Sequence, residues 1–155
     1  MLGDVVEAAL AIGPVLVVTD DPAVVPAFVE VVPDPGEGMG AAVAAGLARV
    51  VDGHTLVVNA DLPAATPAAL RRLAGADLAL VEAADGTTNA LSLPDPSVFA
   101  PLYGPGSAER FRAHAPFVTI AIPELEFDVD VDTDLDRLTV AVLGPRTRAL
   151  LAVPA

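Results

Sequence analysis

The fold is decided by residues 56–63, which read LVVNADLP. A run of aliphatic residues that stops at an acid and a proline is typical of a buried parallel strand, and it places the carboxylate of Asp61 at the edge of a sheet. Ligands bind beyond the carboxyl ends of such strands, so Asp61 is a candidate for holding a metal and a phosphate-bearing ligand. An acid at this position can equally cap a turn or the following helix, and both interpretations stay open.

The segments around this run alternate between helix and strand patterns. Apolar residues over 2–11 follow helical spacing, and Thr66 with Pro67 predicts the start of a second helix whose Leu70 and Leu73 face the core. Further strand patterns occur at residues 15–19, 28–32, 78–81 and 117–122. The stretch at 86–93, GTTNALSL, belongs to a more irregular second half. The alternation predicts βαβ units and a layered α/β fold with a mainly parallel sheet.

Composition narrows the possible functions. The chain has 155 residues of which 54% are hydrophobic, enough for one domain, which we expect to span 1–155. It has no run of about 18 apolar residues and no secretory leader, so we expect a cytoplasmic protein without membrane partners. A net charge of -13 disfavours nucleic acid and anionic lipid as partners. An anionic ligand would therefore need metal ions to offset the field of the protein.

The residue types that are missing exclude some chemistry. The chain has no cysteine, which excludes disulfides, thiolate catalysis and cysteine metal sites. All 8 basic residues are arginine, which excludes Schiff-base chemistry and the lysine of a phosphate-binding loop. His54 and His114 have no partner at metal-binding spacing, so both are interpreted as surface residues. Nothing in the sequence places Ser92, Ser97 or Ser107 near either histidine, and no Ser-His-Asp triad is predicted.

A glycine-rich turn precedes a helical pattern at residues 104–107, which read GPGS. The N–H groups of a helix start can meet an anion there, with the Ser107 hydroxyl as a further donor. The general preference of serine for the N-cap position favours a structural role for Ser107 instead. The turn alone does not decide between these interpretations.

An acidic run occupies residues 127–136, FDVDVDTDLD. A calcium loop counted from Asp128 requires glycine where Thr133 stands, so that interpretation fails. Thr133 and Asp136 fit a capping box at a helix start. Asp128 and Asp130 would share one face of a strand, where their like charges repel unless a cation lies between them. They are therefore candidate ligands of a divalent cation.

Five motifs follow one another in an order typical of one family: NADLP at 59–63, TNAL at 88–91, YGPGS at 103–107, DVDVDTDL at 128–135 and LGPRTRALL at 143–151. The chain resembles the phospholactate or phosphoenolpyruvate guanylyltransferases of deazaflavin coenzyme biosynthesis, relatives of the molybdenum-cofactor guanylyltransferases. The resemblance implies a three-layer αβα sandwich with a mostly parallel, Rossmann-like sheet of the nucleotide-diphospho-sugar transferase type. It also implies transfer of GMP from GTP to phosphoenolpyruvate or 2-phospho-L-lactate, with release of pyrophosphate.

The resemblance also implies a role for individual residues. Asp61 and Asp128 would hold Mg²⁺. Asp130 would be a further ligand, or a residue that contacts the ligands rather than the metal. Asn89, Gly104 and Ser107 would hold the phosphorylated acid. Attack of one phosphate on another gathers negative charge, so metal clamping and alignment would contribute more to catalysis than a general base.

The chain also departs from the family pattern. Relatives begin with a strand and a basic loop around the nucleotide phosphates, whereas this chain starts in the helix that follows. The first strand would be missing from the middle of the sheet, so we expect two strands to re-pair or a gap that another chain fills, with a homo-oligomer as one possibility. Met39-Gly40 replaces the usual Leu-Asn, and GTTN lacks a glycine found between the two threonines, which can shift Asn89.

Two hypotheses from different classes follow. The first is a guanylyltransferase. The second is a non-catalytic, truncated homologue that retains the acceptor and metal half and serves as a binding or assembly subunit.

Overall fold

The computed structural model describes residues 1–129 and 143–151. Its helices are α1 (Leu2–Leu10), η1 (Pro22–Val24), α2 (Met39–Leu47), α3 (Pro67–Ala74), η2 (Pro96–Val98), α4 (Ser107–His114), α5 (Pro123–Glu126) and α7 (Pro145–Leu151). Its strands are β1 (Leu16–Thr19), β2 (Glu30–Pro33), β3 (Thr55–Val58), β4 (Ala79–Glu82), β5 (Thr88–Leu93) and β6 (Val118–Thr119). Within these described residues, no helix has the length and apolar character needed to cross a bilayer.

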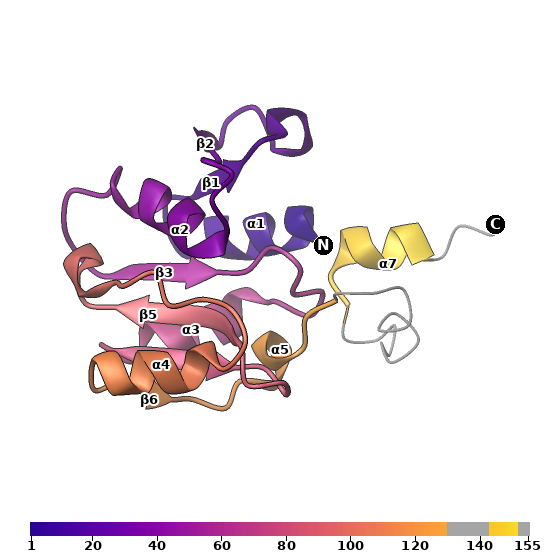
Figure 1. Cartoon of the computed structure of the whole chain (residues 1–155). Coiled ribbons are helices and arrows are strands. Elements are labelled where there is room, and N and C mark those ends of the chain that lie inside the picture. The colour runs from indigo at the N-terminus through magenta and orange to yellow at the C-terminus, as the bar shows by residue number, and fades with distance from the viewer. Residues whose placement is uncertain (130–142, 152–155) are drawn as a thin grey trace.

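The main sheet has four strands in the order β3-β5-β4-β6 (Figure 1). Strand β5 runs antiparallel to both β3 and β4, and β4 runs parallel to β6. Three of these strands, β3, β4 and β6, therefore share one direction, and β5 is the exception. The α/β fold class predicted from the sequence is confirmed.

Strands β1 and β2 form a separate, parallel two-stranded sheet, in which Leu16 pairs with Glu30 and Thr19 with Pro33. Figure 1 shows this pair set apart from β3, toward the top of the view. In the described part of the chain β1 is paired only with β2, and β3 only with β5. Strands β1 and β3 are therefore not paired with each other in the described structure.

Helices cover both faces of the main sheet, which gives the three predicted layers. On one face, α1, α3 and α5 pack against alternate residues of β4, Ala79 and Val81. On the other face, α2 and α4 pack against Leu80. Leu80 lies between Ala79 and Val81 in the strand, so its side chain points to the opposite face. Phe111 of α4 is fully buried at the centre of this second cluster.

The start of α3 was predicted correctly in detail. Thr66 is the N-cap residue, and its Oγ1 accepts a hydrogen bond from the Ala69 N–H at 3.1 Å. Pro67 is the first helical residue, where its missing N–H costs nothing. Leu70 and Leu73 are completely buried, so this helix holds the chain that follows β3 against the sheet.

Three other segments differ from their sequence patterns. Residues 86–93 were expected to be irregular, but β5 lies between β3 and β4 and is buried at every position. Burial on both faces removes the polar alternation that marks a surface strand, which is why the pattern was weak. The strand expected at 28–32 begins only at Glu30 and leaves Phe28 78% exposed. The strand expected at 117–122 shortens to two residues, Val118–Thr119.

Candidate functional site

Asp61 lies just beyond the end of β3, as the sequence predicts. β3 ends at Val58, and the Asn59 N–H continues the pairing by donating to the Asn89 carbonyl at 3.0 Å. Asp61 is partly buried, and Leu62 after it is completely buried. The core therefore holds the backbone that carries the Asp61 carboxylate.

The structure brings Asp128 to the same place. The Val129 N–H donates to the Asp61 carbonyl at 3.3 Å, so the chain that leaves α5 lies along Asp61. Leu125 of α5 is completely buried, and its carbonyl accepts a hydrogen bond of 3.1 Å from the Asn89 side chain. Asp128 has no strand geometry, and Asp130, the third predicted carboxylate, lies outside the described residues, as does the predicted capping box.

Asp61 and Asp128, whose backbones lie close together, carry oxygen ligands of the kind that Mg²⁺ accepts. Magnesium is commonly bound by one or two carboxylates together with substrate phosphates and water. In residues 1–129 and 143–151, no group of three or more His, Asp or Glu side chains is arranged to hold a metal. The residues present therefore fit a metal that the phosphates of a bound ligand help to coordinate, and Mg²⁺ stays a prediction.

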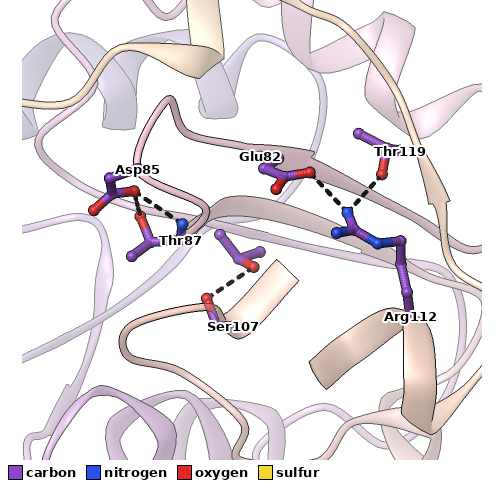
Figure 2. Close-up of polar contacts among 7 residues, drawn as sticks. Glu82, Asp85, Thr87, Ser107, Arg112 and Thr119 are labelled. Atoms are coloured by element: carbon purple, nitrogen blue, oxygen red, sulfur yellow. Dashed lines mark hydrogen bonds and ion pairs between the residues drawn. The ribbon is translucent and has the colours of Figure 1, made fainter. Parts of the chain in front are cut away.

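Buried polar side chains at the start of β5 extend the site. Asn89 is completely buried, and its Oδ1 atom has no hydrogen-bond partner in the described part of the chain. Ser107 donates from Oγ to the Thr88 Oγ1 at 3.0 Å, and both residues are almost completely buried. Figure 2 shows Ser107 at the first turn of its helix, beside the turn that contains Asp85 and Thr87. The role of Thr88 was not predicted, because nothing in the sequence marks Ser107 as its partner.

The prediction that Ser107 is an N-cap residue is wrong. Gly106 occupies that position with φ +69°, and Ser107 is the first residue of α4. A left-handed backbone strongly favours glycine, so the cap falls one residue earlier. The Ala108 N–H donates to the Gly86 carbonyl at 3.2 Å, and the Ser107 hydroxyl ties α4 to β5.

The turn before β5 is shaped by one carboxylate. Asp85 Oδ1 accepts the Thr87 N–H at 2.9 Å and the Thr87 hydroxyl at 2.6 Å (Figure 2). These hydrogen bonds, chiefly the one from the hydroxyl, lower the pKa of Asp85. The closed turn sets where β5 begins, and therefore where Asn89 lies.

A serine-histidine contact is present where none was expected. Ser92 Oγ lies 2.7 Å from His54 Nε2 and donates to the Ala76 carbonyl at 2.5 Å. Ser92 is completely buried, and its proton already goes to a carbonyl, so the hydroxyl is not placed to act as a nucleophile. The contact lies near the end of β5, away from Asn89 at its start. We assign it a structural role.

The predicted residues Asp61, Asn89, Gly104 and Ser107 lie in the part of the chain that matches a known family model. Residues 1–113 match the MobA-like NTP transferase domain. The chain belongs to this family. The relationship to molybdenum-cofactor-type nucleotidyltransferases inferred from the order of the motifs is thereby confirmed.

Three curated relatives match most of the chain. A phosphoenolpyruvate guanylyltransferase of Streptomyces scabiei is 35% identical, over 94% of this chain and 76% of that protein. One of Salinispora arenicola is 38% identical, over 95% and 76%. One of Streptomyces coelicolor is 36% identical, over 96% and 79%. These matches extend beyond residue 113, because they cover nearly the whole chain.

Proposed function

We propose that this protein is a guanylyltransferase that joins GMP from GTP to phosphoenolpyruvate or 2-phospho-L-lactate and releases pyrophosphate. The names of the relatives, at 35–38% identity, support this reaction class. The observation that carries the proposal is the hydrogen bond from the Val129 N–H to the Asp61 carbonyl, since it shows that the backbone next to Asp128 lies beside Asp61. The resemblance to deazaflavin coenzyme enzymes supports a role in that pathway, and we expect the reaction to take place in the cytoplasm.

In this proposal Asp61 and Asp128 hold Mg²⁺, with Asp130 as a further ligand or a residue behind them. Bound magnesium would neutralise phosphate charge, which a protein of net charge -13 needs in order to accept an anionic substrate. Asn89, Gly104 and Ser107 hold the phosphorylated acid, and the turn at Gly104 offers backbone N–H groups to it. The non-catalytic alternative is not favoured, because each of the three relatives is named as a guanylyltransferase and matches at least 94% of this chain.

The proposal is tested by titrating phosphoenolpyruvate and GTP into the protein by calorimetry, each with and without Mg²⁺, followed by an assay of pyrophosphate release. We expect Asp61→Asn to weaken metal-dependent binding of phosphoenolpyruvate by at least roughly tenfold, since even residues behind metal ligands often contribute that much. Asp77→Asn is the matched control. It removes the same charge from an exposed residue before β4, at the opposite end of that strand from the site.

Undiminished, magnesium-dependent binding in Asp61→Asn would remove the metal role of this carboxylate. Binding of the acid without GTP binding or pyrophosphate release would instead support the non-catalytic alternative.

A further inference from the structure

Arg110 of α4 holds the turn that precedes its own helix. Its guanidinium donates to the Leu102 carbonyl from Nε at 3.1 Å and from Nη2 at 2.8 Å. Nη2 also donates to the Tyr103 carbonyl at 3.0 Å, and Nη1 donates to the Pro105 carbonyl. One exposed side chain therefore holds three carbonyls that lie close together in sequence.

These contacts determine which polar groups the turn has left to offer. The Gly104 carbonyl, the only one between Leu102 and Pro105 that Arg110 does not contact, accepts the Ser107 N–H at 2.9 Å. Every carbonyl from residue 102 to residue 105 is thus engaged. The N–H groups of Gly104 and Gly106, by contrast, have no hydrogen-bond partner within the described residues.

This division of donors and acceptors favours an anion. Free carbonyl oxygens would repel a phosphate or carboxylate, whereas unpaired N–H groups in a turn attract one. Gly104 and Gly106 have φ of +107° and +69°, backbone conformations that side-chain-bearing residues rarely adopt. The turn therefore presents donors while Arg110 engages its acceptors.

We infer that Arg110 is a positioning residue for the acceptor site: it keeps the turn at residues 102–106 in the form that offers N–H groups to the phosphorylated acid. The inference rests on the proposed function, which assigns Gly104 and Ser107 to that acid. The planar guanidinium has five donors in a fixed fork and can contact three carbonyls at once. A lysine ammonium keeps the charge but cannot reproduce this geometry.

The experiment compares Arg110→Lys with Arg112→Lys. Arg112 lies on the same helix and instead contacts Glu82 at 2.7 Å and the Thr119 hydroxyl at 3.1 Å, away from the turn (Figure 2). Affinity for phosphoenolpyruvate with Mg²⁺ and affinity for GTP are measured for each protein. The amide NMR signals of Gly104 and Gly106 are followed in the same titrations, and thermal melts check that each variant is folded.

We expect Arg110→Lys to weaken phosphoenolpyruvate binding roughly tenfold, the effect of losing one to two hydrogen bonds to a charged group, without changing GTP binding. Arg112→Lys should bind both ligands as the unmodified protein does. If Arg110→Ala loses as much affinity for phosphoenolpyruvate as Arg110→Lys does, the geometric role is supported. If Arg110→Ala loses affinity and Arg110→Lys does not, the effect comes from the charge and the inference is overturned.

The two hypotheses fail in distinguishable ways. If phosphoenolpyruvate leaves the Gly104 and Gly106 amide signals of the unmodified protein unchanged, the assignment of the acceptor site fails, and the inference fails with it. If the signals respond equally, and at equal ligand concentrations, in the unmodified protein and in Arg110→Lys, the role of Arg110 alone is overturned.

Discussion

Asp4 shows how much one residue depends on partners far away in sequence. It is 3% exposed, and its carboxylate accepts hydrogen bonds from the Arg146 N–H at 2.9 Å, the Thr147 N–H at 2.8 Å and the Thr147 hydroxyl at 2.6 Å. Burial alone raises the pKa of Asp4, but these hydrogen bonds together lower it below its ordinary value. The first backbone N–H groups of a helix have no acceptor within that helix. The Asp4 carboxylate on α1 accepts hydrogen bonds from two of these groups in α7.

The lowered pKa sets the pH range over which Asp4 stabilises the fold. Its contribution is fully present above the pKa of the unfolded chain, about 3.9, and is lost as the pH falls through the lower pKa of the folded protein. We expect Asp4→Asn to reduce the free energy of unfolding by about 1–3 kcal/mol at pH 7. Urea unfolding from pH 3 to pH 7 should show the difference between the two proteins shrinking at the acid end.

Glu7→Gln is the control for this comparison. Glu7 pairs with Arg146 at 3.3 Å, but both side chains are more than 60% exposed, so the change should cost only about 0–1 kcal/mol. A pH-independent difference between Asp4→Asn and the unmodified protein would contradict the assignment.

At the scale of elements, α7 is placed by contacts with two other parts of the chain. Asp4 caps it from α1, and the Gly144 N–H just before it donates to the Pro63 carbonyl at 2.9 Å. The Val129 N–H contacts the Asp61 carbonyl two residues earlier. Val129 and Gly144, described residues on either side of residues 130–142, are therefore both anchored on the stretch that carries Asp61.

Gly144 should tolerate no side chain. A Cβ atom there would overlap Asp4 Cβ and Cγ, so the helix would have to move away from α1. We expect Gly144→Ala to lower the free energy of unfolding by about 1–3 kcal/mol, as overpacked positions do. Gly13→Ala, at a site with nothing within 4 Å, is the matched control. Equal stability of the two variants in urea would show that α7 does not dock as described.

At the scale of the whole molecule, the two sheets differ in burial. Strand β5 is buried at all six positions, whereas every residue of β1 is only partly buried. β1 pairs along one edge in the described structure, and β5 pairs along both. Few buried contacts and an unpaired edge favour local opening.

Hydrogen exchange should follow this difference. We expect amides of β4 and β5 to exchange slowest, at rates that approach global unfolding, and amides of β1 and β2 to exchange well before them. Mass spectrometry of peptides from the two sheets measures this directly. The completely buried helix residue Leu70 serves as an internal reference for slow exchange. Equal protection of the β1 and β5 amides would contradict the expectation.

The sequence alone predicted the features that depend on a few neighbouring residues. Helix α1, the Thr66 cap and the position of Asp61 after a strand all follow from local spacing, turn chemistry or the end of an apolar run. The order of the motifs predicted the family, and the match to residues 1–113 confirmed it.

The tertiary structure decided the features that need a partner from elsewhere in the chain. Only the folded chain shows that β5 is a buried, antiparallel strand, that Ser107 contacts Thr88, and that Asp4 caps α7. The same holds for the hydrogen bond that brings Asp128 beside Asp61. Periodicity and capping are encoded within one or two turns of chain, whereas these contacts depend on how the helices return the chain to the sheet.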